Sequence, residues 1–276
     1  MGNEAQKHPF DELVNGPEGQ IRLAEAALLF AADEYPDLTL NHYVQRLDIL
    51  ARRVAGYPAF NALQRINALR QVLVTEEGFQ GSASVFNNSA GTLLNRVMDT
   101  RRGLPVALSV VWLDVARRLD WPMHGVGLPG HFIVSYDTDG QRILIDPFNQ
   151  GALLSRESCE QLLRTMFGES AELHDAHLNT LAPRGILERM LGNLYAISVS
   201  AEDWEGAARA LRRTVALRPD NVPLRAELGR LLTLGGRLDE ATRVLAEAQR
   251  LARDDEEARL VDTHQTQLLR KLGENN

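Results

Sequence analysis

The strongest constraint on the fold is an internal repeat in the C-terminal third of the chain. The segments DWEGAARALRRTVALRPDN and RLDEATRVLAEAQRLARDD align at an offset of 34 residues. The aligned pairs are Trp204 with Leu238, Ala207 with Ala241, Leu211 with Leu245, Leu217 with Leu251, and Asp220 with Asp254. Each unit has the spacing of two amphipathic helices, so residues 184–276 are predicted to be an all-α helical-repeat domain.

A 34-residue period built of two helices is typical of tetratricopeptide repeats. Pro219 stands where such a repeat ends, and AELGRLLTLGGRLDEA supplies the Leu-Gly pair and the turn. Two unrelated antiparallel helix pairs remain an alternative, because the consensus aromatic residues are absent. Two units are few for a free-standing solenoid, so we expect them to pack on the preceding domain and to bind a protein or peptide partner.

Helical signals also dominate residues 18–80. Three helices are predicted: EGQIRLAEAALLFAADEYP up to Pro36, TLNHYVQRLDILARRVA with Thr39 as N-cap, and FNALQRINALRQVLVTEEG stopped by Gly78. SASVFNNSAG is predicted to be a loop, and TLLNRVMDTRRG a short helix.

The pattern changes after Pro122. HFIVSY and RILIDPF are short apolar runs joined by DTDG, which predicts an antiparallel hairpin. A further helix follows from Ser155 as N-cap. We therefore expect an α+β fold: a domain over residues 1–183, helical over 18–80 and with a small antiparallel sheet in a core over 86–170, followed by the repeats.

The segment RRGLPVALSVVWLDVARRLDWP predicts a buried helix that begins near Gly103. Beyond it lie His131 in PGHFIVSY and Asp146 in ILIDPF. Thiol catalysis needs a helix N-terminus that favours the thiolate, a His as base and a polar group that orients the His. Here Pro105 stands where the thiol belongs.

This order of residues resembles the transglutaminase-like, papain-like superfamily, whose members carry Gly-x-Cys at the start of a buried helix. The ungapped pattern places its Gly on Gly103, its Cys on Pro105, its His on His131 and its Asp on Asp146. More narrowly, the strings Arg-Arg-Gly-x-Pro, Leu-Pro-Gly-His-Phe and Asp-Pro-Phe-Asn, between residues 86 and 151, resemble the bacterial SirB-type family. That resemblance implies C-terminal tetratricopeptide repeats and a Pro at the former Cys position, and it implies no particular biochemical activity.

Pro105 also has a purely structural interpretation. At the first position of a helix its φ is preset, and its missing N–H would have no acceptor in any case. Two other residues could serve as nucleophile: Ser109, one turn further along the same helix face, and Cys159, on a later predicted helix. We expect both to be ordinary buried or surface residues.

His131 and Asp146 have two open interpretations. They are either a structural hydrogen-bonded pair or a remnant dyad in a cleft that binds a peptide, an acyl group or a small molecule. A zinc site formed with His124 matches no established ligand spacing, so no metal or cofactor is expected.

Four further residues are predicted to bind a ligand at this cleft: Asn95, Arg101, Arg102 and Ser109. The two arginines could clamp a carboxylate or a phosphate. Alternatively, they pair with Asp99 and Asp114 in the same chain.

Composition limits the partners and the compartment. The formal net charge of −7 and the absence of a helix-turn-helix pattern count against nucleic acid as a partner. The N-terminal residues show no secretory signal, no run of about 18 apolar residues is present, and there is a single cysteine. We expect a cytoplasmic protein without a membrane span.

These observations predict a pseudoenzyme: a degenerate transglutaminase-like domain that regulates or binds a protein partner. The alternative is a hydrolase or acyltransferase in which His131 and Asp146 activate water or a nucleophile other than Cys.

Overall fold

The computed structural model describes residues 8–138 and 140–274. Its chain divides into two compact units. One unit runs from Pro17 to Met190, and the other combines the chain before Pro17 with Leu191 and the residues after it. The division falls inside α8 (Pro183–Ser200), whereas the sequence placed a domain boundary at the start of this helix. The domain assignment itself stays a prediction.

The unit that contains the repeats includes a helix that the sequence did not indicate. α1 (Pro9–Val14) packs against α9 (Trp204–Leu217). Phe10 is fully buried, and the Arg213 guanidinium lies 5.8 Å from its ring centre. Arg213 also forms an ion pair with Asp11 at 3.2 Å. A pairing across some 200 residues of sequence leaves no local pattern, so periodicity could not reveal it.

The repeat helices follow the predicted period. They are the C-terminal part of α8, then α9, α10 (Val222–Leu234), α11 (Leu238–Leu251) and α12 (Asp255–Glu274). Residues 34 apart occupy equivalent core positions: Ala207 and Ala241 are both fully buried, Leu245 is fully buried, and Leu211 is 4% exposed. Asp203 caps α9 by accepting from the N–H of Gly206 at 2.9 Å. The prediction of helical repeats is confirmed.

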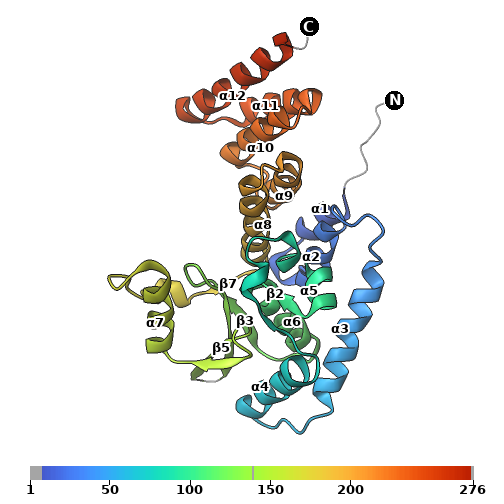
Figure 1. The fold of residues 1–276 in the computed structure, drawn as a ribbon, viewed down its shortest axis with the longest axis vertical. Coiled ribbons are helices and arrows are strands. Elements are labelled where there is room, and N and C mark those ends of the chain that lie inside the picture. The colour runs from blue at the N-terminus through green and yellow to red at the C-terminus, as the bar shows by residue number, and fades with distance from the viewer. Residues whose placement is uncertain (1–7, 139, 275–276) are drawn as a thin grey trace. The chain divides into compact units, whose positions relative to one another are not determined.

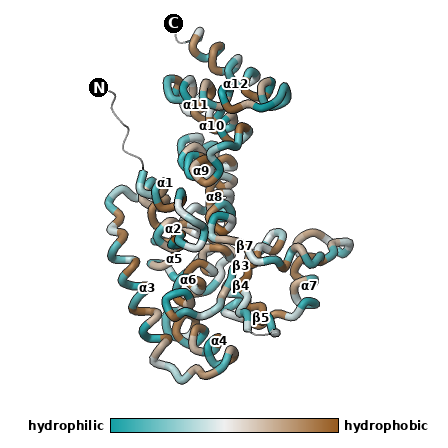
Figure 2. Tube along the Cα trace, turned by 180° about the vertical axis from the view of Figure 1, so that it is seen from behind, coloured by the Kyte–Doolittle hydropathy of each residue, from teal (hydrophilic) through white to brown (hydrophobic). Residues whose placement is uncertain are grey.

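The other unit begins with helices, as predicted, but their limits differ. They are α2 (Leu23–Ala31), α3 (Leu40–Ala55), α4 (Ala62–Arg70) with a π-helical turn over Gln71–Glu76, α5 (Leu94–Thr100) and α6 (Pro105–Arg118). The first helix is shorter than expected: Glu18–Gln20 form a separate 3-10 turn, and the chain leaves α2 before Pro36. α3 alternates polar and apolar faces along its length, which Figure 2 shows as teal and brown.

A five-stranded antiparallel sheet forms the β part, in the order β6-β5-β4-β3-β7. The strands are β3 (Met123–Val126), β4 (Ile133–Thr138), β5 (Gln141–Asp146), β6 (Ala152–Leu154) and β7 (Thr180–Leu181). β4 and β5 form the predicted hairpin, with Thr138 opposite Gln141. Asp139 of the predicted turn lies outside the described residues. The expected α+β fold class is confirmed.

Helices cover both faces of this sheet. α4 and α6 contact β4, and Arg65 of α4 donates to the Tyr136 hydroxyl at 3.0 Å. On the other side α7 (Arg156–Phe167) packs Cys159 and Leu163 with Ile133 and Leu144. Figure 1 shows α6 and α7 on opposite sides of β3 and β5. α6 is the centre of this unit, because every residue from Pro105 to Ala116 is buried.

Two very short strands connect the helical part to the sheet. β1 (Gln80–Gly81) and β2 (Arg102–Gly103) pair in parallel, with Gly81 opposite Gly103. Among the described residues, no helix has the combination of length and apolar composition that a membrane crossing requires.

Candidate functional site

A tight turn places His131 at the start of β4. The His131 N–H donates to the Leu128 carbonyl at 3.1 Å, which closes a four-residue turn with Pro129 second and Gly130 third. Gly130 has φ +70°, and a Pro–Gly pair at these positions is typical of a type II turn. The sequence Leu-Pro-Gly-His therefore sets the position of the imidazole.

Asp146 ends β5 and is fully buried. Its Oδ1 accepts from the backbone N–H groups of Phe148 at 3.0 Å and Asn149 at 3.2 Å. Its Oδ2 accepts from the Asn149 side-chain amide at 2.7 Å. This is the local bonding by which Asp stabilises a turn in its own chain, and it holds the carboxylate in one orientation.

The two side chains form the predicted pair. His131 Nε2 lies 2.9 Å from Asp146 Oδ2, and His131 is only 7% exposed. In the tautomer that carries its proton on Nε2, the imidazole donates this bond to the carboxylate and its Nδ1 has a free lone pair. Nδ1 makes no hydrogen bond to the rest of the described chain. The Phe148 ring packs edge-on against the imidazole, with 5.8 Å between ring centres.

A chain of backbone contacts connects the Asp146 turn to the start of α6. The Gly81 N–H donates to the Phe148 carbonyl at 2.9 Å, and Gly81 pairs with Gly103. Leu104 follows as N-cap of α6, and Pro105 is its first residue. A side chain at position 81 would lie 2.4 Å from the Phe148 ring, so this close approach requires glycine.

Pro105 is buried at the N-terminus of α6. It offers neither a nucleophile nor an N–H at a place where the helix N-termini of other proteins stabilise anions. Ser109 lies one turn further along α6 and is fully buried, and its Oγ has no hydrogen-bond partner in the described chain.

The two arginines bind within their own chain. Arg101 ends α5 in a left-handed conformation (φ 61°), and its guanidinium pairs with Glu77 at 2.6 Å and covers the Phe79 ring at 4.8 Å. Arg102 donates to the Gly78 carbonyl at 2.8 Å. Burial alone raises the pKa of Glu77, but a hydrogen bond from Arg53 and the charge of Arg101 outweigh it, and the pKa is lowered overall.

The alternative pairing of these arginines with Asp99 and Asp114 is wrong. Asp99 pairs with Arg46 at 2.7 Å and accepts from the Tyr43 hydroxyl at 3.0 Å. Asp114 pairs with two arginines of its own helix, Arg117 and Arg118.

Asn95, the remaining predicted ligand-binding residue, lies on α5 and lines a cavity of about 600 Å³. Neither His131 nor Asp146 lines this cavity. Asn95 is 3% exposed.

Cys159 and His124 take no part in the His131–Asp146 pair. Cys159 is fully buried on α7, and burial, followed by the charge of Asp146, raises the pKa of its thiol. The raised pKa keeps the thiol protonated and unreactive near neutral pH. His124 is exposed on β3, opposite Ser135. Within residues 8–138 and 140–274, no three His, Cys, Asp or Glu side chains are grouped closely enough to hold a metal ion.

Sequence reasoning missed the roles of Phe148 and Asn149. The string Asp-Pro-Phe-Asn carried the resemblance, but no role was assigned to its last two residues. An Asp directly before Pro at a strand end is a signal for a side-chain-bonded turn, which indicates that Asp146 binds the backbone that follows. Glu77 was also missed, because its two arginine partners come from distant helices.

Comparison with known proteins agrees with this geometry. Residues 41–192, more than half of the chain, match the transglutaminase-like superfamily, and residues 198–261 match the tetratricopeptide repeat. No solved structure matches this chain.

Among curated proteins, a UPF0162 protein of Xylella fastidiosa is 32% identical over 221 residues, 76% of this chain and 77% of its own length. A UPF0162 protein of Pseudomonas aeruginosa is 31% identical over 199 residues, 71% of this chain and 72% of its own. Human F-box only protein 21 is 26% identical over 173 residues, 58% of this chain and 26% of its own.

The helical core, the antiparallel sheet and the His–Asp pair define the class of protein, a transglutaminase-like domain followed by tetratricopeptide repeats. The chain belongs to the transglutaminase-like superfamily and, within it, to the UPF0162 proteins.

Proposed function

We propose that this protein is a non-catalytic member of its superfamily that binds a protein or peptide partner through its repeats. The observation that carries the proposal is Pro105, the first residue of α6, in the position that the superfamily pattern gives to the nucleophilic Cys. Ser109 and Cys159, the other candidate nucleophiles, are both fully buried. The SirB-type assignment within the superfamily belongs to the same proposal.

The repeats support the second half of the proposal. Tetratricopeptide repeats generally mediate protein–protein interaction, and stacked helix pairs form extended concave surfaces that suit peptides. Two large apolar side chains are exposed on this unit, Leu234 on α10 at 38% and Leu269 on α12 at 67%. Exposed apolar groups of this size are candidates for a partner contact.

A pull-down with the full chain tests partner binding. We expect wild type and His131→Ala to enrich the same partner, and the double variant Leu234→Asp, Leu269→Asp to lose it. Gln267→Asp, an exposed change on the same helix as Leu269, is the matched control. A partner that the double variant retains, or no partner enriched by any form, would contradict the proposal.

A second candidate function rests on the hydrogen bond between His131 and Asp146. Asp146 holds Nε2–H, so Nδ1 could take a proton from a water molecule that attacks an acyl carbon, and the imidazolium could then protonate the leaving group. The carboxylate would stabilise the imidazolium. This describes a hydrolase or an acyltransferase without a covalent intermediate on the protein.

Amide, ester and thioester substrates separate the two candidates. The non-catalytic proposal expects no turnover by wild type above that of His131→Ala. Turnover that His131→Ala abolishes would favour the water mechanism, whereas turnover that survives this substitution would exclude it. His124→Ala, at an exposed position on β3, is the control for the loss of an imidazole.

The compartment and the excluded partners complete the proposal. We place the protein in the cytoplasm, with neither nucleic acid nor membrane as partner, and with no metal or cofactor. The net charge of −7 and the single Cys support this placement. The domain limits 1–183 and 184–276 also remain part of the proposal.

A further inference from the structure

The cavity beside Asn95 is the strongest candidate for a second site. It holds about 600 Å³, within the usual range for small-ligand pockets. Three short segments line it: the turn after α2, the first turn of α3 and one face of α5. The lining residues are Glu34, Tyr35, Pro36, Asp37, Leu38, Thr39, His42, Tyr43, Asn95, Arg96 and Asp99.

Asn95 is buried here without a hydrogen bond. Its side-chain Oδ1 has no partner in the described chain, and no hydrogen bond joins its amide nitrogen to another described residue. An amide that is 97% buried costs free energy when its hydrogen bonds are unmade. Oδ1 is closed off from solvent, so the group that the side chain offers to a ligand in the cavity is its NH2 donor.

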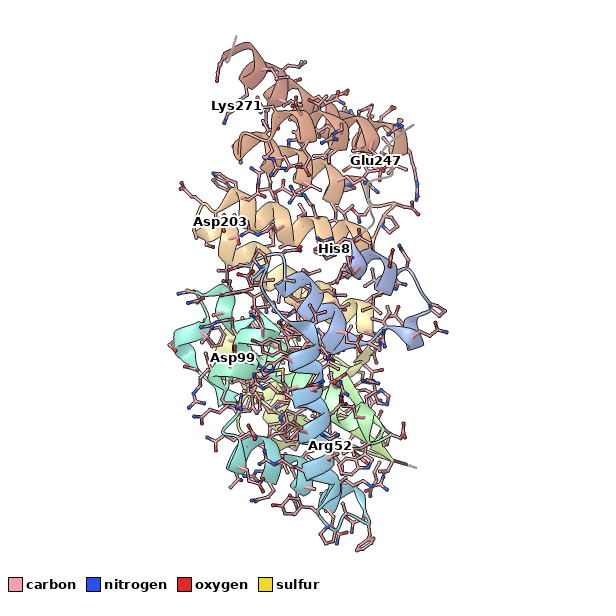
Figure 3. All side chains as sticks on the ribbon, turned by 90° about the vertical axis from the view of Figure 1, so that its right-hand side faces the viewer. His8, Arg52, Asp99, Asp203, Glu247 and Lys271 are labelled. Carbon is pink, nitrogen blue, oxygen red and sulfur yellow. The ribbon has the colours of Figure 1, made fainter. Side chains whose placement is uncertain are left out.

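Arg96, the next residue along α5, has no ion pair with any other described residue. Its guanidinium stacks on the Tyr35 ring at 5.9 Å, and its Nε is buried without a partner. The nearby carboxylate of Asp99, which is labelled in Figure 3, forms its ion pair with Arg46 instead. Both Asp99 oxygens are taken, Oδ1 by Arg46 at 2.7 Å and Oδ2 by Tyr43 at 3.0 Å.

α3 directs its N-terminus to the same cavity. Thr39 is its N-cap residue but makes no side-chain cap bond, and both Thr39 and His42 line the cavity. The first N–H groups of a helix lack intrahelical acceptors and carry partial positive charge. The His42 N–H is already bonded to the Thr39 carbonyl at 3.1 Å, so α3 supplies a favourable field for an anion, and Arg96 and the Asn95 amide nitrogen supply the donors.

The rim of the cavity has the opposite charge. The turn from Tyr35 to Leu38 is closed by a hydrogen bond of 2.9 Å between the Leu38 N–H and the Tyr35 carbonyl. It exposes Asp37, which makes no hydrogen bond or ion pair with the rest of the described chain. Glu34 is also exposed, and within the described chain its carboxylate accepts only from Ser89, at 3.1 Å. A purely anionic ligand would be repelled by this rim.

We propose that this cavity binds a zwitterionic amino compound, a free α-amino acid or a short peptide, by its two charged ends. The carboxylate binds Arg96 and the Asn95 amide nitrogen, and the ammonium binds Asp37 at the rim. Tyr35, Pro36 and Leu38 contact the apolar part of the ligand. None of these residues belongs to the His131–Asp146 pair, so the proposal stands apart from the function of that pair.

Titration calorimetry of the full chain with L-leucyl-L-leucine tests the inference. The same measurement uses the dipeptide amide, which lacks the carboxylate, and the N-acetyl dipeptide, which lacks the ammonium. We expect the free dipeptide to bind and each blocked form to bind about tenfold more weakly, because each loses one charge-assisted contact.

Two variants connect each charge to one end of the ligand. Arg96→Gln should weaken the binding of the free dipeptide until its affinity is no higher than that of the dipeptide amide. Asp37→Asn, a change at an exposed position, should remove the preference of the site for the free dipeptide over the N-acetyl form. Arg52→Gln and Asp262→Asn are matched controls, and Figure 3 shows Arg52 on α3 away from Asp99.

The results that overturn the inference are equally specific. Blocked forms that bind as tightly as the free dipeptide exclude recognition by the charged ends. No binding at about 10 mM dipeptide excludes a site of this class. If the variants weaken the binding of all three compounds by the same factor, Arg96 and Asp37 do not recognise the charged ends.

Discussion

Two polar regions of the transglutaminase-like unit differ in whether their buried polar atoms have hydrogen-bond partners. At the His131–Asp146 pair, the carboxylate accepts four bonds, all from groups within 15 residues of sequence. At the α5 cavity, Asn95 and Arg96 carry buried polar atoms that have no partner in the described chain. The Asp146 carboxylate has its hydrogen-bond partners without a ligand, whereas these atoms of Asn95 and Arg96 do not.

The difference suggests that the first region contributes to the stability of the fold and the second to the binding of a ligand. A buried carboxylate that is fully hydrogen-bonded holds the surrounding backbone in place, and removing it leaves several donors unpaired. A buried amide without partners contributes no such support, and its free energy improves only when a ligand supplies the missing bonds. Substitutions at Asp146 should therefore lower the free energy of unfolding, whereas an apolar substitution at Asn95 should leave it unchanged or raise it.

Asp146→Ala should have the largest effect. It removes the acceptor for two backbone N–H groups, for the Asn149 amide and for His131, and we expect the free energy of unfolding to fall by about 3–5 kcal/mol. Urea denaturation followed by circular dichroism measures it. Asp137→Ala, which breaks the more exposed pair with Arg142 on the same sheet, is the control and should cost at most about 1 kcal/mol. Equal losses for the two variants would contradict the account.

His131→Ala should cost less, because Asp146 keeps three of its four bonds. We expect a loss of about 2 kcal/mol, which corresponds to one buried carboxylate losing a partner. A thermal melt of the variant beside His124→Ala provides the measurement. An unchanged midpoint for His131→Ala would mean that the pair is not buried as described.

Gly81→Ala tests the connection between the Asp146 turn and α6. The added methyl group would lie 2.4 Å from the Phe148 ring, so the ring must move, at a cost of about 1–2 kcal/mol. Gly19→Ala has open space around the new group and should change stability by less than about 0.5 kcal/mol. Indistinguishable urea midpoints for the two variants would show that β1 does not constrain the turn.

Asn95→Leu should have the smallest effect on stability. It replaces an unbonded buried amide with an apolar group of similar size, and we expect a change between zero and a gain of about 1 kcal/mol. Asn67→Leu, at an exposed position on α4, is the control. A loss above about 2 kcal/mol in the same denaturation assay would mean that the Asn95 amide is bonded in the folded protein.

Much of the fold could be predicted because its signals are local. The 34-residue offset predicted equivalent core positions for Ala207 and Ala241, and the apolar runs on either side of the turn predicted the β4–β5 hairpin. The pair of His131 and Asp146 followed from the order of two motifs, since neighbouring antiparallel strands bring their ends together. Ser155 was predicted as a helix cap and accepts from the N–H of Ser158.

The remaining features depend on contacts between distant segments, which a single sequence does not show. The Arg101–Glu77 pair, the packing of α1 on α9 and the cavity at Asn95 each join segments whose spacing has no period. The interruption of the first predicted helix after Gln20 and the π-helical turn after α4 also leave the apolar pattern unchanged. Tertiary packing determined these features, and local propensity did not.

The central proposal is that Pro105 stands beside the His131–Asp146 pair in the place of a nucleophile. The most direct test is the alkylation of a Pro105→Cys variant by iodoacetamide near pH 7, with peptide mapping to separate the new thiol from the buried Cys159. We predict that the new thiol reacts faster than Cys159, and about tenfold faster than in the Pro105→Cys, His131→Ala double variant, because an adjacent imidazole and a helix N-terminus favour the thiolate. A rate no higher than that of Cys159, or a rate that His131→Ala leaves unchanged, would contradict the claim.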